Sequence, residues 1–213
     1  MTRVLRHRIY GFATDQSGTT LVEMAVVLPL FLFLFLGLID FGRLGQEYVW
    51  AEKAMQLAAR KAAVRPPACA GVPDVNLRGA VPANTPPPRF GTMCAAGATV
   101  CVNPGTISCT GNVANPTVAE IWADVSPIMP VHATAANLRF VYGFDRDLGF
   151  LGGPYTPVVT VEITNLSFRF VTPLGGLATL AAGSTAGLPA ANIPFPPMSV
   201  SLPAEDLSQG ESG

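Results

Sequence analysis

The hydrophobic pattern of the chain starts with one long apolar run near the N-terminus. From Met24 to Ile39 the sequence reads MAVVLPLFLFLFLGLI and carries no charge. As a helix this run spans only about 24 Å, less than the bilayer core of about 30 Å. Extending the helix back to Thr19 gives the missing length but takes Glu23 into the apolar segment. The pattern predicts one membrane-spanning helix with an acidic residue near its start, bent or loosened at Pro29.

The pattern changes after this run, but the helical periodicity continues. Residues 40–64 carry an apolar stripe at alternating spacings of three and four residues, with polar residues on the other faces. The stripe consists of Phe41, Leu44, Tyr48, Ala51, Met55, Ala58 and Ala62. Pro66 disfavours the helical conformation at Arg65, so the helix is expected to end near Val64. Two partners for this outer half stay open: the chain's own C-terminal domain, or the helices of other copies in a bundle or filament.

Short β patterns dominate the C-terminal part. β-branched and aromatic residues predict strands at 137–143, 157–171 and 197–202. A short helix is expected at 116–125, capped by Asn115 and with a proline in its first position. A sheet of these strands could pack on the outer half of the long helix.

These elements predict an α+β fold. One long N-terminal helix, transmembrane and continuing outside the membrane, is joined to a small antiparallel-sheet extracytoplasmic domain with long loops. The 20 prolines and 21 glycines support long loops, because most of them follow residue 65. The expected organisation is a cytoplasmic leader at 1–18, a transmembrane and extended helix at 19–64, a loop region rich in Pro, Gly and Cys at 65–136, and a β-rich extracytoplasmic part at 137–213.

Composition and charge narrow the function classes. Charged residues make up 13% of the chain, against about 25% in an ordinary globular protein. The formal net charge of -1 offers no basic surface for nucleic acid. No cluster of residues forms a catalytic, cofactor-binding or metal-ligating pattern, so the chain is not expected to be an enzyme.

The four cysteines all lie in the loop region. They are Cys69, Cys94, Cys101 and Cys109. None forms a C-x-x-C pair, so the usual zinc spacing is missing. An even number in a loop-rich stretch favours two disulfides in an oxidising compartment, with four free thiols as the alternative. Three pairings are possible, and the sequence does not choose among them.

The orientation of the chain follows from charge and cysteines together. Three arginines, Arg3, Arg6 and Arg8, precede the apolar run, so positive charge slightly favours a cytoplasmic N-terminus. The cysteine cluster agrees, because disulfides form outside the cytoplasm. A cleaved secretory signal is the alternative, but no small-x-small site ends the apolar run. We expect a single-pass protein of the bacterial inner membrane, with its C-terminal domain periplasmic or extracellular.

Glu23 is the most unusual residue of the apolar segment. A carboxylate in a spanning helix costs about 2–3 kcal/mol at the bilayer centre and less near the interface. One explanation is local: Thr20 and Glu23 fit a capping box at a helix start. The other is functional, in which the carboxylate meets a positive charge from another molecule. The second explanation is favoured by the resemblance described next.

Residues 17–64 resemble the TadE-like proteins of tight-adherence (Flp-type) pilus systems. The matching features are Gly18, Glu23, Leu28-Pro29, Asp40-Phe41-Gly42-Arg43 and Ala58-Ala59-Arg60. The resemblance implies a minor pilin, or pseudopilin, that works in pilus assembly. In that class a prepilin peptidase cuts after a glycine and a glutamate follows five residues beyond the cut. A cut after Gly18 would make Thr19 the new N-terminus and Glu23 its fifth residue.

The resemblance also implies partners. They are membrane lipid, other pilin or pseudopilin subunits, the Tad assembly machinery and, if the chain is processed, the peptidase. The C-terminal part is larger and richer in proline than a bare Flp pilin, which favours a minor subunit or an assembly factor. An unprocessed single-pass scaffold or binding protein of the envelope is the alternative function.

Overall fold

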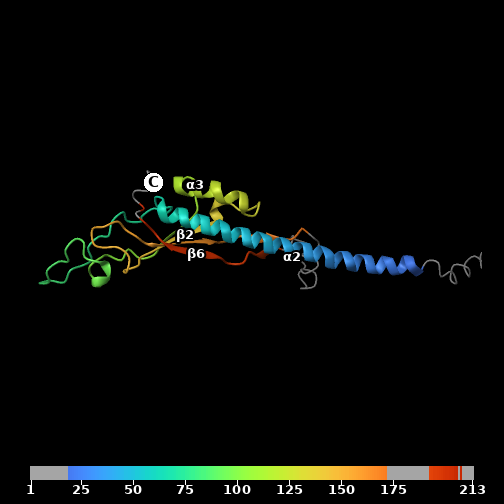
Figure 1. The fold of residues 1–213 in the computed structure, drawn as a ribbon, viewed down its shortest axis with the longest axis horizontal. Helices are drawn as coiled ribbons and strands as arrows, with labels where there is room; N and C mark the ends of the chain where they lie inside the picture. Colours follow the sequence, from blue (N-terminus) through green and yellow to red (C-terminus); the bar gives the residue numbers. More distant parts are fainter. Residues whose placement is uncertain (1–18, 172–191, 206, 208–213) are drawn as a thin grey trace, which may run out of the picture. The chain divides into compact units, whose positions relative to one another are not determined.

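The structure is a computed structural model, and it describes residues 19–171, 192–205 and 207. The chain forms two compact units: residues 1–44 with 169–192, and residues 45–168 with 193–213. The helix α2 (Thr19–Val64) contributes to both (Figure 1). The expected leader at 1–18 lies outside the described residues.

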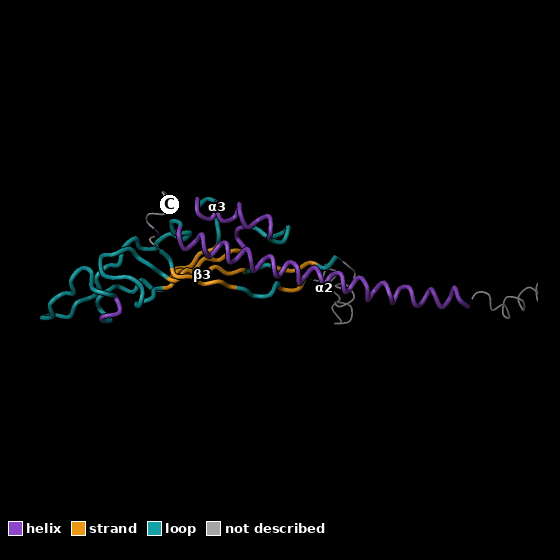
Figure 2. The backbone as a smooth tube through the Cα atoms, in the orientation of Figure 1, coloured by secondary structure: helices purple, strands orange, loops and turns teal. Residues whose placement is uncertain are grey.

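The second unit holds a four-stranded antiparallel sheet in the order β1-β2-β3-β6. Figure 2 shows its strands in orange along the second half of α2. The regular elements are β1 (Ile107–Thr110), α3 (Pro116–Val125), β2 (Leu138–Gly143), β3 (Val158–Ile163) and β6 (Ser199–Pro203), with short 3-10 helices at Cys94–Ala96, Ser126–Ile128 and Ala135–Asn137. The α+β fold class is thus confirmed.

Alternation along the strands creates the core of this unit. Three cross-strand pairs of β2 and β3 face inward: Leu138 with Ile163, Phe140 with Val161, and Tyr142 with Val159. Their buried side chains meet the small-residue face of α2, where the buried residues are Ala51, Ala54, Met55, Ala58, Ala59, Ala62 and Ala63. Alanine keeps this face thin, which lets a helix lie close to a sheet. The alanines therefore serve the chain's own domain, and the alternative that they pack against other copies is wrong for residues 51–63.

The helix α3 begins as its sequence predicts. The side chain of Asn115 accepts a hydrogen bond from the N–H of Val118 at 3.2 Å, and Pro116 takes the first helical position. The inner face of α3 buries Val118, Ile121 and Val125. Figure 1 draws α3 on one side of the second half of α2, and strands β2 and β6 on the other.

The predicted strand at 157–171 is wrong in its length. It ends at Ile163 and resumes as β4 (Ser167–Arg169), which pairs with β5 (Asn192–Pro194) in a separate two-stranded sheet. Asn165 lies between the two pieces with φ 54°, a left-handed conformation that asparagine tolerates better than most residues. The short strand β1 was not predicted at all.

Two disulfides organise the loop region. Cys69 is bonded to Cys109 and Cys94 to Cys101. The first bond joins the chain just after α2 to strand β1, and the N–H of Ala68 donates to the Tyr142 hydroxyl at 2.8 Å beside it. The loop region is therefore fastened directly to the core of the sheet.

Candidate functional site

The first half of α2 presents an apolar surface that the described chain leaves uncovered. Its most apolar stretch of eighteen residues has a mean hydropathy of 2.6, and none of that stretch is buried. Leu21 is 75% exposed, and large side chains stay exposed along the helix as far as Phe41. By length and composition this is a helix that can cross a membrane. Among the described residues it is the one helix that meets this test.

Glu23 lies in the second turn of this helix and is exposed. Its neighbours Val22 and Met24 are 65% and 62% exposed, so the carboxylate is part of an otherwise apolar surface. Thr20 already lies inside α2, whereas a capping box needs it before the first helical turn. The local explanation for Glu23 therefore loses its support. Thr19 is the first described residue of the helix, and Gly18 lies outside the described residues.

Pro29 lies inside the apolar half of the helix. Proline has no N–H, so it leaves the carbonyl four residues earlier without its usual helical bond. The helix continues through this position as a single element. Such a proline is tolerated in membrane helices, where local adjustment restores the freed group.

Asp40 lies at the end of the apolar half of α2 and is an acidic residue with a buried side chain. The side chain is fully buried, although its neighbours Ile39 and Phe41 are exposed. Its Oδ1 atom accepts a hydrogen bond from the N–H of Val171 at 3.2 Å and pairs with Arg43 at 3.3 Å. Next to it, the rings of Phe41 and Phe170 meet edge to face at 6.4 Å. All of these residues belong to the first unit.

The structural role of Asp40 was missed from the sequence. Asp40 was noted only as part of the resemblance, because its backbone partner is 131 residues away along the chain. The local signal was an acid directly after an apolar run. A carboxylate at that place needs partners if it is to be buried.

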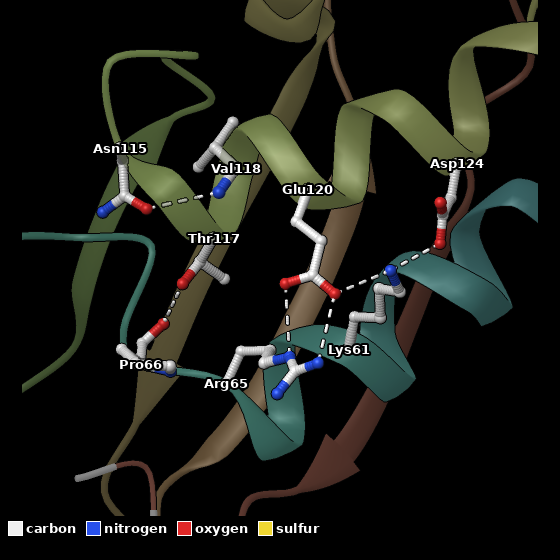
Figure 3. Close-up of polar contacts among 8 residues, drawn as sticks. All are labelled: Lys61, Arg65, Pro66, Asn115, Thr117, Val118, Glu120 and Asp124. Carbon is white, nitrogen blue, oxygen red and sulfur yellow. Dashed lines mark hydrogen bonds and ion pairs between the residues drawn. The ribbon is translucent and has the colours of Figure 1, made fainter. Parts of the chain in front are cut away.

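The end of α2 is fixed to α3 by ion pairs, drawn in Figure 3. The Lys61 ammonium contacts Glu120 at 2.9 Å and also pairs with Asp124. The Arg65 guanidinium contacts Glu120 at 3.2 Å, and the Thr117 hydroxyl donates to the Pro66 carbonyl at 2.8 Å. Arg65, Thr117 and Glu120 also line a shallow hollow of about 620 Å³, but their polar groups already have partners within the chain. The cluster is therefore structural.

This cluster gives a prediction for pH. The hydrogen bond from Lys61, aided by the charges of Lys61 and Arg65, holds the pKa of Glu120 below its usual value of 4.5. A lowered carboxylate pKa stabilises the fold above the unfolded-state value, and the contribution is lost as pH falls through the folded-state value. Because Glu120 is 41% exposed, the Glu120→Gln variant should lose at most about 1 kcal/mol at pH 7.

Thermal denaturation of the full chain in detergent between pH 7 and pH 3 checks this. The difference between wild type and Glu120→Gln should shrink toward zero at the acid end. The matched control is Glu52→Gln, which changes an exposed acid of α2 outside this ion-pair cluster. A difference that is constant over this range would contradict the assignment.

Comparison with protein-family models gives a match to the long helix. Residues 18–63 match the family model described as TadE-like protein. Neither the comparison with curated proteins nor the comparison with solved structures gave a match. The match covers all of α2 except Val64, which includes the apolar half, Glu23, Asp40 and the whole small-residue face.

Proposed function

We propose that the chain is a minor pilin-like subunit, or pseudopilin. The premise is the match of residues 18–63 to the TadE-like family, which associates the chain with the assembly of tight-adherence pili. In this proposal α2 anchors the chain in the bacterial inner membrane. The N-terminus is cytoplasmic, and residues 65–213 lie in the periplasm or outside the cell.

The observation that carries this proposal is a carboxylate on an uncovered apolar helix. Glu23 is exposed between exposed apolar neighbours, and no internal partner explains it among the described residues. A charge in lipid is costly, and a positive charge from a neighbouring molecule would offset that cost. In the proposal, a prepilin peptidase cuts after Gly18, and the amine of the new Thr19 N-terminus on one subunit pairs with Glu23 of another.

The two disulfides support the orientation. Disulfides form in oxidising compartments, which for a bacterial membrane protein means the periplasmic side. Three arginines precede the helix, and positive charge favours the cytoplasmic side. The disulfides and the arginines therefore both favour a cytoplasmic N-terminus and a C-terminal part outside the cytoplasm.

The N-terminus of the mature chain tests the proposal. N-terminal sequencing of protein purified from membranes of a strain with an intact pilus system should find Thr19 as the first residue. The Gly18→Ala variant should keep the full leader from Met1, because the peptidase class requires the glycine. A wild-type chain that starts at Met1 would instead favour an unprocessed envelope scaffold.

A further inference from the structure

The first unit carries a second group of exposed apolar residues besides the helix surface. Val171 is 76% exposed and Phe41 is 63% exposed, although both are large and apolar. The Phe41 and Phe170 rings pack edge to face at 6.4 Å, so the segment 169–171 lies against the helix at this level. We call Phe41, Arg169, Phe170 and Val171 the boundary patch.

The position of this patch along the helix is set by the length of the apolar run. From Thr20 to Ile39 the helix spans about 30 Å, which equals the hydrocarbon thickness of a bilayer. The patch begins at the next turn. If α2 spans the membrane, as the proposed function requires, the patch lies at the level of the lipid headgroups.

The composition of the patch suits that level. Aromatic residues are favoured at the membrane–water interface, and arginines there can reach lipid phosphates. Arg169 is exposed, and Arg43 adds a second cation one turn along the helix from Asp40. Because Arg43 is paired with Asp40, Arg169 supplies the exposed positive charge that complements anionic phosphate.

Asp40 explains how the patch is held. The Val171 N–H donates to the buried Asp40 carboxylate, and this backbone donor is kept in every substitution of Val171 except proline. Arg43 pairs with the same oxygen atom. Asp40 is therefore a positioning residue that fixes a distant segment against the helix.

We infer that the boundary patch is a second membrane contact, in which Phe41, Phe170 and Val171 enter the interfacial layer of the bilayer and Arg169 binds lipid phosphate. The partner is the lipid surface itself. This contact would fix the chain segment at 169–171 to the membrane in addition to the spanning helix. The inference rests on the membrane anchoring in the proposed function.

Tryptophan quenching in vesicles tests the inference. The two natural tryptophans, Trp50 and Trp122, are first replaced by phenylalanine, and Val171→Trp then supplies the reporter. The full chain is placed in vesicles of phosphatidylethanolamine and phosphatidylglycerol that contain phosphatidylcholine brominated near the headgroup end of its acyl chains. We expect Val171→Trp to be quenched at least about twofold more than Val113→Trp, a control in an exposed loop of the second unit.

Leu32→Trp reports on the helix separately. It should be quenched most by lipid brominated at the far end of the acyl chains, because Leu32 lies in the middle of the apolar run. Quenching of Leu32→Trp without quenching of Val171→Trp would overturn the boundary contact and leave the anchor intact. Absence of quenching at both positions would overturn the contact together with its premise. Neither reading depends on pilus assembly or processing.

Two further variants separate the parts of the patch. Asp40→Ala should reduce quenching of Val171→Trp to the level of the loop control, while Leu32→Trp stays unchanged. Asp147→Ala, an exposed acid of the second unit, is the matched control and should change neither reporter. Arg169→Gln should weaken quenching of Val171→Trp in vesicles with phosphatidylglycerol. Equal quenching with and without Arg169 or Asp40 would overturn their assigned roles.

Discussion

Replacing Cys69 and Cys109 by alanine should lower the stability of the second unit by about 4 kcal/mol. The bond closes a loop with a sequence separation of 40 residues, and closing a loop of this size lowers the entropy of the unfolded chain and raises its free energy by about that much. Cys69 is buried, and its bond joins the end of α2 to the edge strand β1. Losing it would remove the covalent link between the chain after α2 and this edge of the sheet.

The second disulfide supplies the matched control. Cys94 and Cys101 are only 7 residues apart, so the same reasoning gives about 2 kcal/mol for their removal. The measurement is thermal denaturation of the full chain in detergent, followed by circular dichroism. At about 2–4 °C per kcal/mol, the Cys69 and Cys109 variant should melt about 8–16 °C below wild type. An equal or smaller loss than for the Cys94 and Cys101 variant would contradict this ranking.

Elements with a local signal could be predicted from the sequence. The helix end at Val64 follows from the proline two residues later, and α3 follows from Asn115 and Pro116. Strand β3 follows from alternation, since Val159, Val161 and Ile163 are the buried residues of that strand. In each case neighbours in the sequence decide the structure.

Elements that depend on distant partners could not be predicted. Strand β1 has four residues, two of them Ser108 and Cys109, and exists through its pairing with β2 and the bond to Cys69. The break between β3 and β4 depends on one left-handed asparagine. Pairing of β4 with β5 adds to the break, because it draws the second piece into another sheet.

The same difference between local signals and distant partners applies to the candidate site. The apolar helix and the exposed Glu23 could be predicted, since both depend on composition over a single helix. The burial of Asp40 and the ion pairs of Lys61 and Arg65 with α3 could not, because their partners lie far along the chain. The small-residue face of α2 is a third case. Its periodicity was clear from the sequence, but the chain's own domain and the helices of other copies fitted it equally well until the sheet was known.

Glu23→Ala should abolish assembly of the pilus while leaving the chain in the membrane. The carboxylate lies on an apolar helix surface, where it costs up to about 2–3 kcal/mol in lipid. Its removal should therefore make membrane insertion of the helix slightly more favourable. In the proposed function it would also remove the charge that meets the amine of a neighbouring subunit, so assembly and insertion should respond in opposite directions.

The experiment measures both responses in the same cells. Pili are counted by electron microscopy, and the membrane-bound fraction of the chain is measured by extraction with alkali. Glu23→Asp keeps the charge with a shorter side chain and should retain part of the assembly. Glu52→Ala removes an exposed acid from the outer half of the same helix and should leave both readouts unchanged. Normal pilus numbers in the Glu23→Ala strain would show that assembly does not need the carboxylate, and would rule it out as an assembly contact. The cost of placing Glu23 in lipid would then be left without a compensating partner.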